Sequence, residues 1–177
     1  MPRGYRRYIR YSRNKKRYSN ETTSIAFESN MTNSTYPVSG NNPQIRGFTL
    51  VGSTTIQGTR KVKNMTISLS SIGPPVPLLC AVVYCPGGMQ PQELHIATNP
   101  NSGTDLYEPS QNVIMQFVLN PSITATLVNT NVQTFRTRLA RNLDSNDYIA
   151  LIVKPAFDIA NAAPVKVSGV FNYAIAY

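Results

Sequence analysis

Few of the residues that build catalytic and metal sites occur in this sequence. Its 177 positions hold one histidine, His95, two cysteines and eight scattered acidic residues. His95 has no cysteine or acid at ligand spacing, so we interpret it as an ordinary surface or core histidine. The acids form no paired-carboxylate motif, and Gly87-Gly88 is not followed by the Gly-Lys-Ser/Thr of a phosphate-binding loop. We therefore expect no enzyme activity, no metal site and no cofactor.

Long apolar runs and a secretory leader are also missing. No stretch approaches the roughly 18 consecutive apolar residues of a membrane-spanning helix, so we expect no membrane insertion. No apolar run follows the N-terminal charges, as it would in a signal peptide. Cys80 and Cys85 lie five positions apart in an apolar run typical of a strand. Their side chains are expected on opposite faces, as unbridged, buried hydrophobes in a reducing compartment.

The positive charge of the chain is concentrated at its N-terminus. The chain has 17 Lys and Arg and 8 Asp and Glu residues; eight of the bases lie in the first 18 residues, and no acid precedes Glu21. The other 159 residues hold nine bases against eight acids, a net charge of +1. Charge this dense repels itself and cannot be buried unpaired. We expect a disordered basic arm over residues 1–20 and one domain over residues 21–177.

The arm has the composition of a nucleic-acid-binding tail. Lysine and arginine displace counterions from phosphates, and the interleaved tyrosines can stack on unpaired bases, which favours single strands. The predicted contacts in the arm are Arg3, Arg6, Arg7, Arg10, Arg13, Lys15, Lys16, Arg17, Tyr5, Tyr8 and Tyr11. A solvated tail used for nuclear import or solubility is the alternative, and the two roles can coexist.

Behind the arm, apolar residues recur with the period of strands. Met65, Ile67 and Leu69 alternate with polar residues over 59–71, whereas Val62 is out of phase, which predicts a bulge near residues 63 and 64. Continuous apolar runs predict buried strands over 78–85, 113–119 and 147–154. The longest alternation ends the chain, with one face formed by Val165, Val167, Phe171, Tyr173, Ile175 and Tyr177.

Weaker patterns complete the expected architecture. Strands are expected over 22–29, 45–57, 123–128 and 132–139, with loops over 30–43, 89–109 and 156–164 and a turn over 142–146. In 132–139, Phe135, Thr137 and Leu139 alternate with Arg136 and Arg138, so one face is apolar and the other cationic. No segment has a convincing helical pattern. About eight to ten short strands separated by turn residues predict an all-β sandwich or barrel.

The ordered set of segments resembles a known family, the capsid proteins of circular Rep-encoding single-stranded DNA viruses of the circovirus and nanovirus kind. The arm, RGYRRYIRYSRNKKR, is similar to their arginine-rich N-terminus. The segment opening with Arg60-Lys61-Val62-Lys63 is similar to their second strand. LYEPSQNVIMQFVL, FRTRLARNLDSNDYIALIV and the closing VKVSGVFNYAIAY resemble their later strands.

The resemblance implies a single jelly-roll β-sandwich of about eight antiparallel strands. It implies a T=1 icosahedral shell of about 60 copies around a circular single-stranded DNA genome, with the arm packaging the DNA. Arg13, Lys15, Lys16 and Arg17 would then form a nuclear localisation signal. The implied partners are host nuclear import receptors and an unknown host-cell attachment factor, and the implied locations are the virion and the host nucleus.

Alternatives remain at this point. The same arm and fold suit the capsid protein of a small satellite RNA virus, and a monomeric single-strand-binding β-barrel, such as an OB-fold, belongs to a different class. Arg136 and Arg138 are predicted DNA contacts. They also suit a solvated strand face or a subunit interface, because the sequence does not say which face of the sandwich points inward.

Overall fold

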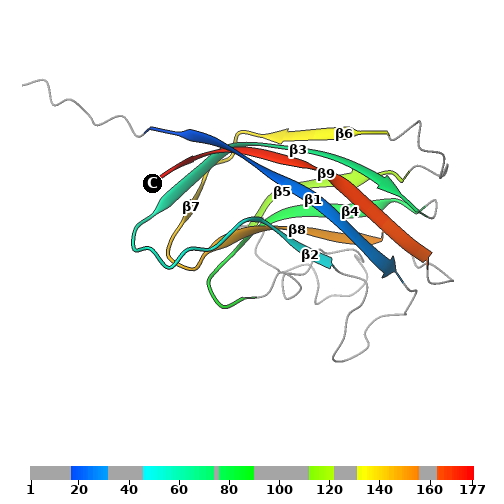
Figure 1. Ribbon diagram of the computed structural model, residues 1–177, viewed down its shortest axis with the longest axis horizontal. Coiled ribbons are helices and arrows are strands. Elements are labelled where there is room, and N and C mark those ends of the chain that lie inside the picture. Colours follow the sequence, from blue (N-terminus) through cyan, green and yellow to red (C-terminus); the bar gives the residue numbers. More distant parts are fainter. Residues whose placement is uncertain (1–16, 32–45, 74–75, 90–111, 122–130, 156–162) are drawn as a thin grey trace, which may run out of the picture.

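The chain folds into two antiparallel sheets that pack face to face as a β-sandwich (Figure 1). The computed structural model describes residues 17–31, 46–73, 76–89, 112–121, 131–155 and 163–177. These residues contain no α-helix, which confirms the expected all-β class. No helix among them is long and apolar enough to cross a membrane.

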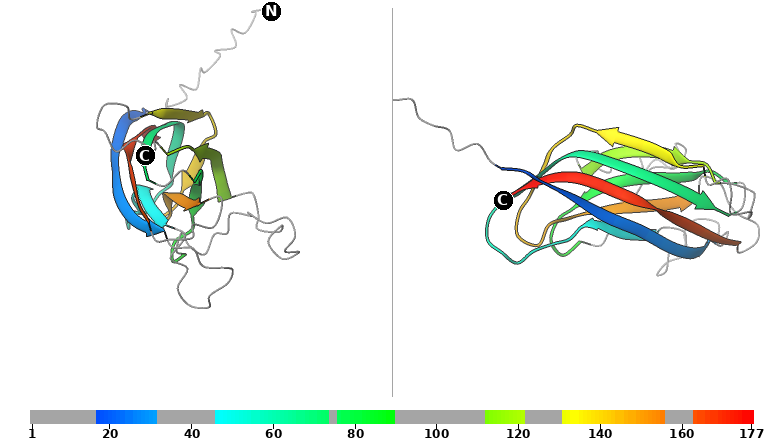
Figure 2. Two further views of the ribbon diagram at one scale, coloured as in Figure 1. Left: turned by 90° about the vertical axis from the view of Figure 1, so that its right-hand side faces the viewer. Right: turned by 45° about the horizontal axis from the view of Figure 1, so that its top comes forward.

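Nine strands lie in the described residues. They are β1 (Ser19–Met31), β2 (Arg46–Val51), β3 (Arg60–Ile72), β4 (Leu78–Cys85), β5 (Val113–Leu119), β6 (Gln133–Thr137), β7 (Arg141–Leu143), β8 (Tyr148–Pro155) and β9 (Ala163–Ala176). One sheet has the order β1-β9-β3-β6, with β7 also pairing β3, and the other has the order β2-β8-β4-β5. The end-on view in Figure 2 shows the two sheets facing each other.

The inner face of the five-stranded sheet is built by the two strongest alternations of the sequence. Met65, Ile67 and Leu69 of β3 are fully buried, as predicted, and so is Phe171 of β9. They pack against inward side chains of β2, β4, β5 and β8 in one core. Because β9 pairs with β1 on one side and β3 on the other, it lies inside the sheet, and its length of 14 residues is used on both edges.

A bulge in β3 lies where the phase of Val62 predicted it. The register between β3 and β9 shifts between Lys63 and Thr66, and Asn64 has a φ of 53°. Asparagine tolerates this left-handed conformation better than most residues. The extra residue reverses the alternation, so Val62 joins the core while Lys61 and Lys63 lie on the outer face. Without the bulge both lysines would point inward.

The outer face of the four-stranded sheet is apolar and buried. Ala81, Val83 and Cys85 of β4 and Ala150 and Ile152 of β8 form a second buried cluster there. The other cysteine, Cys80, lies in the main core, and both thiols are free. The prediction that β4 is covered on both faces, with its cysteines on opposite sides, is therefore confirmed.

A pair of stacked phenylalanines closes each side of the sandwich. Phe27 of β1 and Phe48 of β2 have ring centroids 6.1 Å apart, and Thr23 donates a hydrogen bond to the carbonyl oxygen of Leu50 nearby, at 2.7 Å. On the other side, the centroids of Phe117 and Phe135 lie 4.0 Å apart. These pairs join the edge strands of the two sheets, so the sheets are tied together beyond their common core.

Several predicted details are wrong, chiefly at strand ends and edges. β5 is not a buried strand: Val118 is 46 % exposed, because β5 is the edge of its sheet. Leu139 and Tyr177 are also exposed, since β6 ends at Thr137 and β9 at Ala176.

The bounds of other segments also differ from those predicted. β1 covers 13 residues, more than the predicted 22–29, while β2 ends at Val51 and residues 52–59 form a connection. Part of the predicted turn over 142–146 belongs to β7. The predicted strand 123–128 and most of the predicted loops 30–43, 89–109 and 156–164 lie outside the described residues.

Candidate nucleic-acid interface

The outer face of the five-stranded sheet is open and polar. The strand register places Thr22, Asn172, Thr66 and Arg136 in one row across four strands. Thr22 Oγ1 donates a hydrogen bond of 2.6 Å to Asn172 Oδ1. In the next row, the hydroxyl groups of Ser68 and Thr134 are 2.9 Å apart. Short polar side chains thus bond to one another along the face.

Four exposed or half-buried bases surround one end of this face. Lys61 and Lys63 project from β3, turned outward by the bulge, and Arg136 projects from the neighbouring strand β6. Arg138 follows β6 and is exposed; because β6 runs antiparallel to β3, it lies toward the lysine end of the sheet. Alternate residues of a strand are about 7 Å apart and adjacent strands about 4.8 Å apart, so these cations can meet successive phosphates of one extended strand.

The chain before β1 is anchored at the same end of the face. The ammonium of Lys63 lies 3.5 Å from the centroid of the Tyr18 ring, a cation–π contact between two half-buried side chains. In the register, Ala174 and Ala176 of β9 lie beside Lys63 and Lys61. Both alanines are buried, and their small side chains leave room for this contact above them.

The anchored Tyr18 determines where the basic arm is attached. Arg17, directly before it, is exposed, and β1 begins beside the last residues of β9 (Figure 1). Residues 1–16 are covalently joined to this corner. The predicted arm contacts that lie outside the described residues are Arg3, Arg6, Arg7, Arg10, Arg13, Lys15, Lys16, Tyr5, Tyr8 and Tyr11.

The acidic side chains of the described residues form no ion pair with these bases. Glu28 is at the opposite end of the outer face, where its Oε2 lies 3.3 Å from Lys166 Nζ in an exposed ion pair. Glu21 lies opposite Tyr173 in the register, so it is on the other face of β1 from Thr22. Asp144 and Asp147 belong to the β7–β8 turn. The cluster of Arg17, Lys61, Lys63, Arg136 and Arg138 is therefore not neutralised by ion pairs with the described acids.

Sequence patterning found part of this site. Arg136 and Arg138 are exposed opposite the inward Phe135, as predicted. Lys61 and Lys63 were not predicted as contacts, although the phase break at Val62 is the signal that turns them outward. Arg60, next to them, is buried: it donates to the carbonyl oxygens of Gly52 and Asp147, at 2.8 and 2.9 Å.

The Asp147 side chain has a structural role that explains its burial. Its carboxylate accepts hydrogen bonds from Tyr84 Oη at 2.6 Å, from the backbone N–H of Gly87 at 3.0 Å and from that of Asp144 at 2.9 Å. Burial and then the bond to Asp147 raise the pKa of Tyr84 to about 12. The carboxylate joins two connections at one end of the sandwich and caps the turn before β8, a common role of aspartate.

The thiols are poor nucleophiles in this structure. Burial raises the pKa of Cys80 well above its ordinary value, and burial raises the pKa of Cys85 to about 11. Both are therefore protonated near neutral pH. The described residues contain no group of three or more His, Cys, Asp or Glu side chains that could hold a metal ion, and His95 lies outside them.

This arrangement can bind a polyanion by contacting the phosphates of the polyanion's own backbone. The described outer face offers cations and hydroxyl groups. The ring of Tyr18, at the lysine end of the face, is already covered by Lys63. Such a surface contacts phosphate and sugar and carries little sequence information. Comparison of the chain with protein-family models gives no match, and comparison with curated proteins gives none either.

Proposed function

We propose that this protein is the capsid subunit of a small single-stranded DNA virus. About 60 copies form a T=1 icosahedral shell and package a circular genome. The observation that carries the proposal is the attachment of a dense basic arm at the corner of an open, basic sheet face, on a domain whose net charge is only +1. The arm and the face hold polyanionic cargo while the rest of the sandwich is free to pack against other copies.

The proposed fold is the single jelly roll. The strand order supports it: β1, β3, β6 and β9, with β7 beside β3, form one sheet, and β2, β4, β5 and β8 form the other. Apart from the step from β4 to β5, which stay in one sheet, and from β6 to β7, successive strands cross between the sheets. That alternation is the connectivity of two Greek keys wrapped into a sandwich, as in many capsid domains.

The two outer faces support one orientation of the subunit in the shell. The five-stranded sheet carries the basic cluster, whereas the outer face of the four-stranded sheet is buried and apolar. We place the five-stranded sheet toward the cargo. In about 60 copies the eight arm charges give roughly 480 positive charges, and the four sheet bases Lys61, Lys63, Arg136 and Arg138 add roughly 240.

The proposal also covers entry into the nucleus and attachment to the cell. The basic run Arg13, Lys15, Lys16 and Arg17 serves as the nuclear localisation signal and binds host import receptors. A host-cell attachment factor of unknown identity binds the outside of the shell. The protein then occurs in the virion and in the host nucleus.

An OB-type single-strand-binding protein is less well supported. Such barrels bind successive bases by stacking them on aromatic side chains of a sheet face. Here the described outer face presents hydroxyl groups and cations, with Tyr18 already covered. An RNA cargo, as in a satellite virus, uses the same phosphate contacts and is therefore an outcome of the test below.

Imaging of the purified full-length protein tests the proposal. Size-exclusion chromatography with light scattering, followed by negative-stain microscopy, should give discrete closed particles that contain nucleic acid. Digestion of the extracted cargo by DNase, and its resistance to RNase, identify single-stranded DNA; the reverse result supports the RNA-virus alternative. A monomer that stays dispersed at high concentration with or without oligonucleotide would contradict the proposal.

A further inference from the structure

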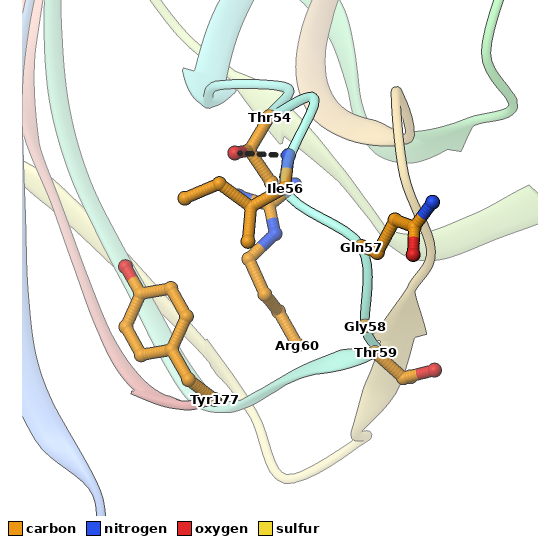
Figure 3. Close-up of a pocket in the computed structure, with 7 residues that line it drawn as sticks. All are labelled: Thr54, Ile56, Gln57, Gly58, Thr59, Arg60 and Tyr177. Carbon is orange, nitrogen blue, oxygen red and sulfur yellow. Dashed lines mark hydrogen bonds between the residues drawn. The ribbon is translucent and has the colours of Figure 1, made fainter.

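An apolar pocket lies at the end of the sandwich where the β2–β3 connection meets the last residue of β9. It has a volume of about 90 Å³ and is lined by residues 54 and 56–60 together with Tyr177. Figure 3 shows Tyr177 on one side of the pocket and Ile56 and Arg60 on the other. None of these residues belongs to the basic cluster on the sheet face.

The two apolar walls of the pocket are unusually exposed. Ile56 is 71 % exposed and Tyr177 is 78 % exposed, the highest values among the large hydrophobic side chains that the structure describes. Leaving a side chain of this size in water forgoes the free energy that its burial would supply. Exposed apolar side chains gathered around a hollow mark an interaction site more often than single scattered ones do.

The connection that carries Ile56 is held in place. The carbonyl oxygen of Thr54 accepts hydrogen bonds from the backbone N–H of Asn146 at 2.9 Å and from Ser145 Oγ at 3.4 Å. Thr59 Oγ1 donates to Asp144 Oδ1 at 2.7 Å. The pocket is therefore formed before anything binds, which lowers the entropy cost of binding.

Arg60 lines the pocket with the carbon atoms of its side chain. The side chain is 7 % exposed. Its two terminal nitrogens donate to the backbone carbonyl oxygens of Gly52 and Asp147. Its Nε is buried without a hydrogen-bond partner, and none of the described carboxylates lies within salt-bridge distance of it. The nitrogens of Arg60 are therefore buried behind the pocket wall, and the pocket offers an incoming side chain an almost wholly apolar lining.

We infer that this pocket receives an apolar side chain from a second copy of this chain. The inference rests on the proposed self-assembly. The volume of the pocket suits a single side chain and is well below the roughly 300–1,000 Å³ of small-molecule sites. Tyrosine and arginine, which line it, are enriched at the centres of protein interfaces.

The rest of the described surface offers complementary groups. Val132 and Leu139, beside β6, are 58 % and 54 % exposed, and Val118 is 46 % exposed. All three lie outside the pocket. A side chain from one place that fills a hollow at another place makes a head-to-tail contact, and contacts of this kind form a ring around a symmetry axis when their rotation closes. The pocket would thus be one half of a repeated contact in the shell.

Polar substitution at the pocket tests this inference in the full-length protein. Ile56→Ser and Tyr177→Ala should fold normally, because both side chains are exposed, but each should raise the protein concentration needed for assembly at least about tenfold. Val170→Ser is the matched control: Val170 is exposed on the five-stranded sheet, away from the pocket, and its replacement should leave assembly unchanged. Light scattering measures assembly, and thermal denaturation measures folding.

The outcomes separate this inference from the proposed function. If the wild-type protein forms particles and both pocket variants form them at the same concentration, the pocket is not a subunit contact, although the capsid proposal stands. If the wild-type protein forms no particles under any condition, the proposed function is wrong and the inference falls with it. Loss of assembly in Val170→Ser to the same degree as in the pocket variants would also overturn the inference.

Discussion

Asn64 shows how one residue positions the candidate interface. With its φ of 53°, it supplies the extra residue of the β3 bulge. The alternation on its two sides is therefore opposite: Val62 and Met65 are both buried, although three positions separate them. Lys61 and Lys63 reach the outer face for this reason alone. The backbone conformation of Asn64 thus determines both which side chains of β3 enter the core and which lysines reach the outer face.

Gly169 is the position where the five-stranded sheet tolerates no side chain. A Cβ atom there would lie 2.0 Å from the backbone oxygen of Ser68 and 2.9 Å from Leu69 Cδ2. We expect Gly169→Ala to lower the free energy of unfolding by about 3 kcal/mol, because the obstructing oxygen belongs to the backbone of β3 and cannot move aside. Chemical denaturation of the two proteins measures the difference.

Gly52→Ala is the matched control for that substitution. A Cβ atom at Gly52 has no neighbour within 4 Å. The stability of this variant should stay within about 0.5 kcal/mol of wild type. Equal stability of Gly169→Ala and Gly52→Ala would show that β9 and β3 do not pack in the register described.

At the scale of elements, β3, β6 and the start of β1 together form the candidate interface. β3 contributes the two lysines, β6 contributes Arg136, and β1 fixes Tyr18 and Arg17 beside them. β9 lies between β1 and β3, and it presents asparagine and alanine side chains on this part of the outer face. The face is therefore a property of strand pairing, since no one segment carries it.

Neutralising the sheet bases should weaken binding of single-stranded DNA in a salt-dependent way. In the triple variant Lys61→Gln, Lys63→Gln, Arg136→Gln, the slope of log affinity against log salt concentration should fall by about 2, since each phosphate contact contributes about 0.7. Fluorescence anisotropy with a labelled oligonucleotide over a salt series measures the slope.

Lys166→Gln provides the control on the same face. Lys166 is engaged with Glu28 at the other end of the sheet, so its replacement should change the slope little. If the triple variant and Lys166→Gln have the same slope as the wild-type protein, the outer face does not contact the nucleic acid.

At the scale of the whole molecule, the basic groups and the buried apolar face lie on different parts of the protein. The arm holds eight of the 17 bases, the five-stranded sheet has an open basic face, and the four-stranded sheet has a buried apolar one. A nearly neutral body avoids the mutual repulsion that a uniformly basic subunit would meet in a shell. In the proposed shell, this arrangement would allow many copies to approach one another with their cations on the side of the cargo.

Deleting residues 1–16 should separate folding from packaging. The truncated protein keeps Tyr18 on Lys63 and every strand of the sandwich, so its melting temperature should change little. It loses seven bases, so particles that still form should hold much less nucleic acid, measured by their ratio of absorbance at 260 and 280 nm. Encapsidation equal to that of the full-length protein would contradict the role assigned to the arm.

The strength of a pattern in the sequence decided how well each part of the fold was predicted. The alternation in β3 and β9 and the continuous apolar run of β4 identified their buried faces correctly, because burial of one or both faces imposes these patterns directly. The edge strands were predicted less well. Val118 and Leu139 were assigned to buried faces, yet local composition does not tell whether a strand has a second neighbour.

The sequence alone determined the all-β class, the core faces of the long strands, the bulge in β3 and the concentration of charge before Glu21. These are local properties, written in neighbouring residues through the period of a strand and the sum of nearby charges. Only the tertiary structure decided that Lys61, Lys63 and Arg136 share a face with the root of the arm, and that Ile56 and Tyr177 border one pocket. These residues are far apart along the chain, and long-range strand pairing brings them together.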